Sequence, residues 1–178
     1  MTLPKGAHAL LMTGQPLASH PEWFQVDTVV CALGTTIRQA GSQEAFRLVD
    51  HTLVLEIARL ARAQGARHFL VVSALGADPA SRVFYNRVKG EMERDLAALG
   101  FDAVTVARPS LLLGERAEFR LGERLGQWAS RWFAPLIPDS HRPVHVAQVA
   151  SGLVAACQQP RAGLHVLDNT QLRKNPAP

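Results

Sequence analysis

Long apolar runs, cysteines and basic clusters are scarce in this chain of 178 residues. No apolar run reaches the roughly 18 to 20 residues that a membrane-spanning helix needs, and the opening MTLPKGAHALLMTGQ is too weakly apolar for a secretory signal. The two cysteines, Cys31 and Cys157, lie in apolar stretches, which favours buried free thiols in a reducing compartment. We therefore expect a cytoplasmic protein with no membrane partner.

Basic clusters are missing although the net charge is +4 and the isoelectric point is about 9.7. The arginines are spread along the chain and lie close to acids, as in GEMERD and GERAEFRLGER. A nucleic-acid surface would instead gather Lys and Arg on one face. The mixed pattern predicts a solvated surface and no nucleic-acid partner.

Apolar segments rich in β-branched residues alternate with helical patterns along the chain. Three of them predict buried strands: VDTVVCAL at 26–33, RHFLVVSALG ending near Ser73, and FDAVTVARPS stopped by Pro109. Helical patterns follow the first two strands, the second of them from Ser81 to Leu99, and PVHVAQVASGLVAACQ and GLHVL add a strand with a helix and a last strand. This order predicts an α/β fold, a Rossmann-type parallel sheet with helices on both faces, in a single domain of residues 1–178.

Polar residues follow each of the predicted strands. Ligands of parallel sheets bind at the carboxyl ends of the strands, so these positions are candidates for a site. They are Gly34 and Thr35 after the first strand, Ser73 after the second, and Arg108, Pro109 and Ser110 after the third.

Tyr85 is the only tyrosine of the chain, and Lys89, one of three lysines, follows it by four residues. On a helix the two side chains project side by side. An ordinary phenol has a pKa of about 10, and a neighbouring ammonium would lower it toward neutrality. With Ser73 facing the same crevice, the pair would suit carbonyl reduction or alcohol oxidation. The alternative is an ordinary pair on a helix surface, which most Tyr-x-x-x-Lys matches are.

Six blocks in a fixed order make the pattern more specific: CALGTT, AGSQEAFRLVD, HFLVVSALGAD, FYNRVKGEME, VARPSLLLGER and FRLGERL. With these blocks the chain resembles the atypical part of the short-chain dehydrogenase/reductase superfamily. It looks like the branch of NAD(P)-binding oxidoreductases that includes the Tat-interacting protein and its bacterial relatives. The match runs from about Val26 to about Leu167.

The resemblance implies a binding site for NADP or NAD. Tyr85 would be the catalytic acid and base, Lys89 its partner on the nicotinamide ribose, and Ser73 the hydroxyl that orients the substrate. One position departs from the superfamily pattern, because Asp50 stands where many members carry an asparagine. The resemblance also implies cofactor contacts at Gly34, Thr35, Lys89, Arg108, Pro109 and Ser110.

The glycine-rich turn that holds the pyrophosphate in dinucleotide folds is missing from the sequence. VDTVVCAL, normally the fourth strand, begins after only 25 residues, so we expect the chain to lack the first βαβ unit. The strand VDTVVCAL would then form an exposed edge of the sheet. Either residues 7–13 cover that edge, or a second copy pairs there as a homodimer, or the gene product is truncated. Cofactor binding would be weak or lost.

The region 109–178 is expected to supply a small substrate cover, with Leu121, Leu125, Trp128 and Trp132 as a helical stripe. Its shortness disfavours a bulky substrate. His141 and His145 have a spacing that can chelate a metal on a helix, but Pro143 between them favours extended chain, and we expect no metal site.

The sequence therefore favours an NAD(P)-dependent oxidoreductase that acts on a small carbonyl or alcohol. Two alternatives stay open: a non-catalytic remnant that serves as a regulatory protein-interaction module, and, less favoured because of the short C-terminal region, a nucleotide-sugar epimerase.

Overall fold

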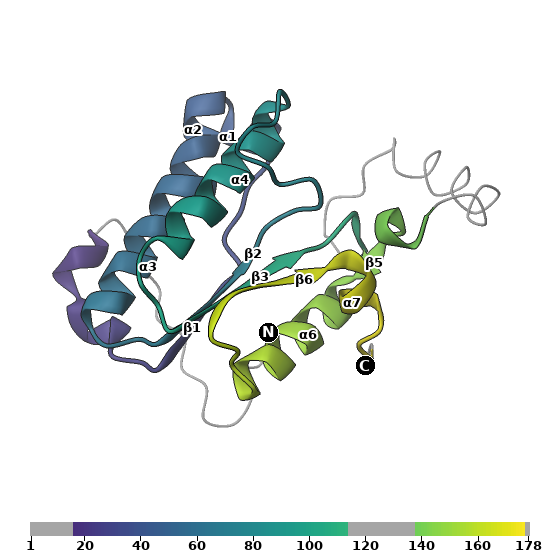
Figure 1. Ribbon diagram of the computed structural model, residues 1–178. Helices are drawn as coiled ribbons and strands as arrows, with labels where there is room; N and C mark the ends of the chain where they lie inside the picture. The colour runs from purple at the N-terminus through teal and green to yellow at the C-terminus, as the bar shows by residue number, and fades with distance from the viewer. Residues whose placement is uncertain (1–15, 114–137, 177–178) are drawn as a thin grey trace, which may run out of the picture.

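A parallel sheet forms the centre of the computed structural model, which describes residues 16–113 and 138–176 (Figure 1). Its four strands have the spatial order β1-β2-β3-β6, and every neighbouring pair is parallel. The strands are β1 (Thr28–Cys31), β2 (His68–Val72), β3 (Ala103–Arg108) and β6 (Gly163–Asp168). The parallel sheet predicted from the alternating strands and helices is confirmed.

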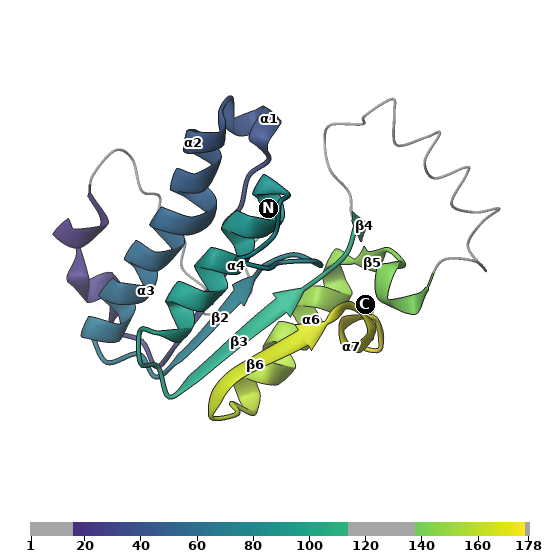
Figure 2. The ribbon, with the colours of Figure 1, turned by 45° about the horizontal axis from the view of Figure 1, so that its top comes forward.

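Helices cover both faces of this sheet, as Figures 1 and 2 show from two directions. One face carries a continuous helical stretch and the helix that follows β2, and the other face carries the helix that precedes β6. The first group is α2 (Gln43–Arg47), the π-helical η3 (Leu48–Leu53), α3 (Val54–Ala63) and α4 (Phe84–Ala97). The second group is α6 (Val146–Gln158), with the short α7 (Asn169–Arg173) after β6.

Smaller elements complete the described parts of the chain. A short α1 (Ile37–Ala40) lies between β1 and α2, and two 3-10 turns, η1 (Leu17–Ser19) and η2 (Pro21–Phe24), precede β1. β4 (Leu112–Leu113) and β5 (Val144–His145) form a second, two-stranded parallel sheet, and η5 (Asp139–His141) leads into β5.

The apolar core is divided by the sheet because successive strand residues point to opposite faces. Phe69 and Val71 of β2 pack with α3 and α4, whereas Leu70 of the same strand packs with α6 and α7. On α3 the buried residues are Val54, Leu55, Ala58 and Ala61. Both faces of β2 and β3 are thus covered, as their continuous apolar runs predicted.

Strand β1 is an edge among the described strands, because its only partner there is β2. Val30 in the middle of β1 is 51% exposed. The segment 7–13, expected to cover this edge, lies outside the described residues, and pairing with a second copy stays a prediction. The helical stripe from Leu121 to Trp132 and the part of the substrate cover at 114–137 also lie outside them.

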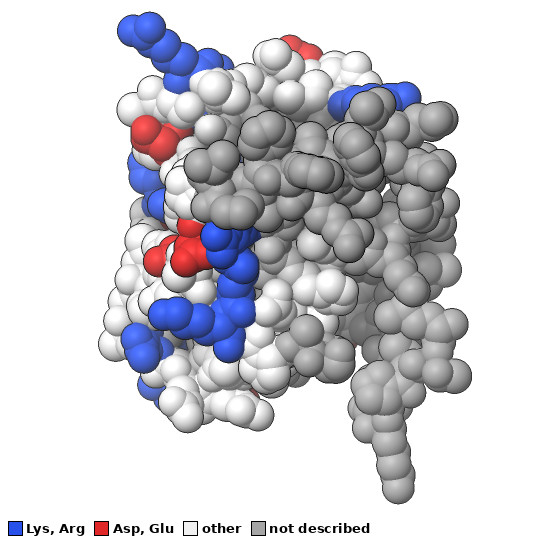
Figure 3. All heavy atoms as spheres, turned by 90° about the vertical axis from the view of Figure 1, so that its right-hand side faces the viewer, with Lys and Arg blue, Asp and Glu red and all other residues white. Residues whose placement is uncertain are grey.

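The surface carries charges of both signs. On the face in Figure 3, acidic and basic side chains of the described residues lie next to one another, in line with the mixed charge of the sequence. None of the helices in 16–113 and 138–176 is long and apolar enough to cross a membrane.

Candidate active site

Asp50 lies at the turn where the long helical stretch changes its geometry. Ser42 starts this stretch, its hydroxyl accepting a hydrogen bond from the N–H of Ala45 at 3.1 Å. The chain then passes through the π-helical η3, an irregularity that is common at functional sites. Asp50 in η3 is only 1% exposed. A carboxylate at such depth requires partners, since burial of an unpaired charge is costly.

Two partners hold the Asp50 carboxylate. Oδ1 lies 2.7 Å from Nζ of Lys89, which is itself 4% exposed, and Oδ2 accepts a hydrogen bond of 2.8 Å from the N–H of Thr35. Gly34 covers the pair from outside: a Cβ there would lie 3.3 Å from Asp50 Oδ1 and 3.9 Å from Lys89 Nζ. Gly34 is exposed, so among the described residues it lies between the ion pair and solvent.

Helix α4 carries Tyr85, Lys89 and Glu93 at intervals of four residues, which places them along one face. Lys89 and Glu93 are buried, and Tyr85 is half-buried. Gly90 on the same helix lets the loop after β2 come close, because a Cβ there would lie 2.2 Å from the carbonyl carbon of Asp78. The loop that follows β2 therefore packs closely against α4, the helix that carries Tyr85.

The phenol of Tyr85 does not have the electrostatics that the sequence predicted. Its ring packs on Phe46 with a centroid separation of 5.4 Å. Burial, and next the negative charge of Asp50, raise the pKa of Tyr85 above its ordinary value. The expectation that Lys89 acidifies Tyr85 is therefore wrong, since the ammonium is paired with Asp50.

Ser73 follows β2 directly and continues its pairing, its N–H donating to the carbonyl of Ala107 at 2.8 Å. Two residues further on, the N–H of Leu75 donates to the carbonyl of Pro109, also at 2.8 Å. The Ser73 hydroxyl is buried and has no hydrogen-bond partner among the described residues. Buried hydroxyls are normally satisfied, so this oxygen is a candidate for binding a ligand.

Arg108 at the end of β3 is bound to Glu93. Its Nε lies 3.1 Å from both carboxylate oxygens and its Nη2 lies 2.5 Å from Oε2, a forked pair. The hydrogen bonds to Glu93 raise the pKa of Arg108. The guanidinium is therefore held against α4, although part of it is open to solvent.

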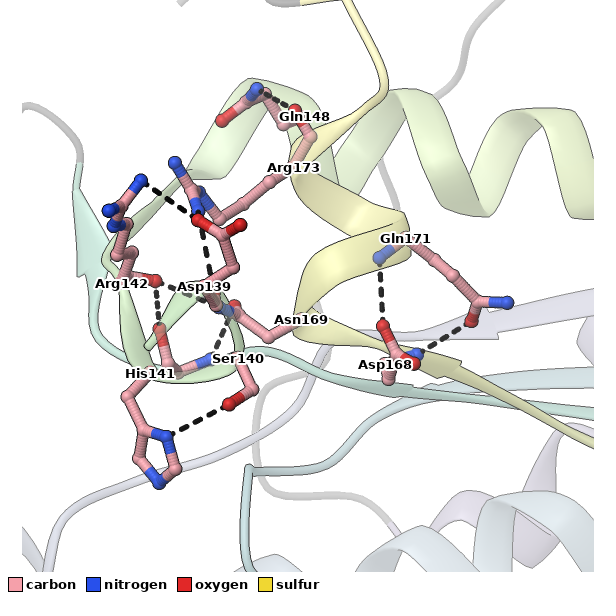
Figure 4. A network of polar contacts seen from close by, with 10 residues as sticks. Asp139, Ser140, His141, Arg142, Gln148, Asp168, Asn169, Gln171 and Arg173 are labelled. Carbon is pink, nitrogen blue, oxygen red and sulfur yellow. Dashed lines mark hydrogen bonds and ion pairs between the residues drawn. The ribbon is translucent and has the colours of Figure 1, made fainter. Parts of the chain in front are cut away.

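Ser110 belongs to a second polar cluster, between the end of β3 and the C-terminal elements. Figure 4 shows its members Asp139, Arg142, Asn169 and Arg173. Its N–H donates to Oδ1 of the buried Asn169, and its hydroxyl donates to the carbonyl of Arg142 at 2.6 Å. Asn169 also donates to that carbonyl at 2.8 Å. Asp139 forms ion pairs with Arg142 and Arg173. These contacts bind α7 and η5 to the chain that follows the carboxyl end of β3.

The sequence-predicted residues thus fall into two groups. The first group comes together around Asp50 and consists of Gly34, Thr35, Lys89 and Tyr85. The second group follows β3. Arg108 binds Glu93 of α4, the carbonyl of Pro109 accepts from the loop that begins at Ser73, and Ser110 binds Asn169. The sequence marked Asp50 only as a departure from a pattern. Asn169 carried no signal, because its partners are far away along the chain.

Comparison with known proteins finds solved structures with a similar fold. The structure superimposes on RMD from Pseudomonas aeruginosa, complexed with NADPH, with a TM-score of 0.62 at 19% identity over 92% of this chain and 70% of that one. A UDP-glucose 4-epimerase from Thermotoga maritima gives 0.60 at 14% identity over 83% of this chain and 59% of that one. At these identities the likeness establishes the fold, which confirms the Rossmann-type prediction.

Curated relatives are closer in sequence. Protein HTATIP2 of Rattus norvegicus is 45% identical over 64% of this chain and 45% of its own length. Protein fmp52, mitochondrial, of Emericella nidulans is 36% identical over 78% of this chain and 58% of its own. The chain thus spans about half the length of the curated relatives that it matches.

These relatives correct one expectation and confirm another. Several fungal relatives are named as mitochondrial proteins, so the cytoplasmic location inferred from the composition is wrong. The resemblance to the branch that includes the Tat-interacting protein is confirmed. The HIM1 family model matches residues 9–129, more than half of the sequence, and the chain belongs to the HIM1 family.

Proposed function

We propose that the chain carries the nicotinamide and substrate side of an NAD(P)-dependent oxidoreductase of the short-chain type, acting on a small carbonyl or alcohol. One observation supports it above the others: the buried Lys89 ammonium lies directly behind the exposed Gly34, with Tyr85 one helical turn earlier. A lysine so placed has donors for ribose hydroxyls, and the phenol beside it has a proton for a substrate oxygen.

The chemistry of the site fits a nicotinamide nucleoside. The unpartnered hydroxyl of Ser73 offers a donor for a carbonyl oxygen, and the loop at Gly34 leaves the backbone open to close approach. The solved neighbours support this choice of ligand, since RMD is described with NADPH and others with NAD. When bound, the reduced nicotinamide supplies a hydride to the carbonyl carbon.

The residues of the chain supply the proton. Tyr85 gives the proton of its hydroxyl to the carbonyl oxygen, so that the carbonyl becomes an alcohol and the phenol a phenolate. Ser73 orients that oxygen from the end of β2. Because the phenol starts protonated at neutral pH, it is ready to act as the acid.

The pyrophosphate has no glycine-rich turn to bind in this sequence. We therefore expect the affinity of these residues for the nucleotide to come mainly from contacts at the ribose end.

Titration with NADPH and NADH, followed by fluorescence of the three tryptophans or by calorimetry, tests the proposal. Binding in the micromolar range that weakens in Lys89→Met supports it. Lys174→Met is the matched control, because it removes an exposed ammonium far from the site along the chain. If Lys89→Met does not fold, a rise in the melting temperature of the wild type with NADPH reports binding instead. No binding at millimolar nucleotide contradicts the proposal.

A second candidate is a protein-interaction module without catalysis. It is favoured by the unpaired side of β1 among the described strands, where the exposed Val30 lies. Such edges bind added strands. The same titration separates the two candidates, since an interaction module has no need to bind the nucleotide.

A further inference from the structure

Strand β1 is covered on only one of its two faces among the described residues. Val29 and Cys31 pack with the core on the side of α3. Val30 points to the opposite face, because it pairs in register with Leu70, whose side chain packs with α6. Helix α6 itself lies over β2 and β3, and Val30 is 51% exposed. A bare strip of the sheet thus runs along β1 beside α6.

The flank of α6 that borders this strip is apolar as well. Gly152 faces α7, which follows the other edge strand, since a Cβ there would lie 3.1 Å from Leu172 Cδ2. Val146, Ala150 and Val154 are spaced by four residues on the flank away from α7. All three are exposed, Val154 by 57%. Wall and floor of the strip are therefore both apolar.

Charge distinguishes α6 from the helices on the other face of the sheet (Figure 2). The thirteen residues of α6 include no Asp, Glu, Lys or Arg. The outer side of α4, by contrast, carries Arg87, Glu91, Arg94 and Asp95. A helix that is apolar all round is normally buried, whereas a helix with one charged face meets water. The open side of α6 is thus suited to contact with another apolar surface.

The bare strip has room for one helix. Neighbouring strands lie about 4.8 Å apart, so β1 is about 7 Å to the side of a helix centred over β2 and β3. Packed helices lie about 8–10 Å apart. A helix that packed against the flank of α6 would therefore lie directly over Val30.

We propose that a second copy of this chain covers the strip, with the α6 of each copy lying over Val30 of the other in a two-fold dimer. Helix α6 fits as the occupant because its open side carries no charge. Two copies that exchange the same contact form a closed pair. A contact without charges also avoids the repulsion that a net charge of +4 on each copy would otherwise cause.

The face of β1 is a better contact than its edge. The strand has only four residues, so its edge offers few backbone hydrogen bonds to a partner strand. The exposed valines lie on the face and on α6 instead. This inference stands apart from the proposed function, because it uses none of the residues around Asp50.

The area of the contact predicts a weak dimer. A helix of thirteen residues is about 20 Å long and about 10 Å wide, so two adjoining helices cover roughly 400 Å² of each copy. Standard interfaces bury about 800 Å² per partner. We therefore expect an equilibrium of monomer and dimer with a dissociation constant in the micromolar range.

Sedimentation equilibrium of the wild-type chain and of two charged variants tests the proposal. Val30→Lys and Val154→Glu place a charge on the floor and on the wall of the strip, and each alone should weaken dimerisation at least about tenfold, because an unpaired charge would be buried. Val83→Glu is the matched control. It alters a valine that is 58% exposed just before α4, and it should dimerise like the wild type.

An equimolar mixture of Val30→Lys and Val154→Glu makes the test specific for this arrangement. In the mixed dimer the two opposite charges meet in one contact, and the other contact keeps both valines, so the dimer should return. If either variant does not fold by circular dichroism, Thr28→Lys and Ala150→Glu take their places on the same strip.

Three results would overturn the inference. The first is a wild-type chain that stays monomeric at millimolar concentration, which would mean that something other than a second copy covers the strip. The second is a dimer that Val30→Lys and Val154→Glu leave unchanged. The third is a mixture of the two variants that stays as weakly associated as each variant alone.

Discussion

Gly90 of α4 lies against the backbone of Asp78, so closely that a Cβ on the glycine would be 2.2 Å from the Asp78 carbonyl carbon. The N–H of Asp78 also donates to the carbonyl of Asn86 at 3.1 Å. This contact binds the loop that begins at Ser73 to the helix that carries Tyr85. The relative placement of the two hydroxyls thus depends on the absence of a side chain at position 90.

Replacement of Gly90 by alanine should destabilise the chain by about 1–3 kcal/mol, because backbone atoms must move to admit the methyl group. Gly152→Ala on α6 is the matched control. Its Cβ would come within 2.8 Å of the Asn175 amide nitrogen and 3.1 Å of Leu172 Cδ2, which are ends of side chains and not backbone, so the shift that it requires is smaller. The gain in helix propensity, roughly 1 kcal/mol, should offset part of that cost, so Gly152→Ala should destabilise the chain less than Gly90→Ala. Urea unfolding of both variants measures the difference, and equal losses would contradict the close packing.

Ser73 and Ser110 should respond oppositely to replacement by alanine. Ser110→Ala removes the hydrogen bond to the Arg142 carbonyl and should lower the free energy of unfolding by about 1 kcal/mol. Ser73→Ala removes a buried hydroxyl without a partner among the described residues, so stability should stay equal or rise. Thermal unfolding compares the two. A marked loss in Ser73→Ala would mean that its hydroxyl is part of the folded framework and not reserved for a ligand.

His68 should make the fold sensitive to mild acid. It is 3% exposed in β2, and burial lowers the pKa of its imidazole in the folded chain. The unfolded chain therefore binds a proton at higher pH than the folded chain does. The stability linked to His68 is complete above the unfolded pKa, about 6.5, and is lost as the pH falls from there toward the lower folded pKa.

Stability curves between neutral pH and mild acid, measured for the wild type and His68→Gln, test this expectation. The variant should show a shallower decline below about pH 6.5, the unfolded pKa of histidine. His141→Gln, which alters an exposed imidazole, should follow the wild type. Parallel curves for His68→Gln and the wild type would show that His68 is protonated equally in both states.

The sheet was predictable from the sequence because its signals are local. The apolar segments around Val30, Phe69 and Val106 fix the strands by themselves, and glycines and prolines mark their ends. The order of strands and helices then leaves a parallel sheet as the simplest arrangement. By contrast, the short α7 escaped prediction, since its five residues hold too little apolar periodicity.

The site was predictable in its members but not in its electrostatics. Spacing on one helix correctly suggested that Tyr85 and Lys89 share a face, yet it could not show which other group competes for the ammonium. That group, Asp50, reaches Lys89 from a different helical segment. The same limit applies to Arg108, whose carboxylate partner Glu93 comes from α4. Contacts between distant segments determine which charged groups pair with each other, and a single sequence does not show these contacts.

The π-helical turn at Leu48–Leu53 has a consequence for how this protein tolerates length changes. Each residue of an α-helix advances the side chain by about 100° around the axis. Loss of one residue between the Ser42 cap and Asp50 would turn the carboxylate away from Lys89, even with every other side chain around Asp50 unchanged. The contact between Asp50 and Lys89 therefore depends on the number of residues in this helical stretch as much as on the aspartate itself.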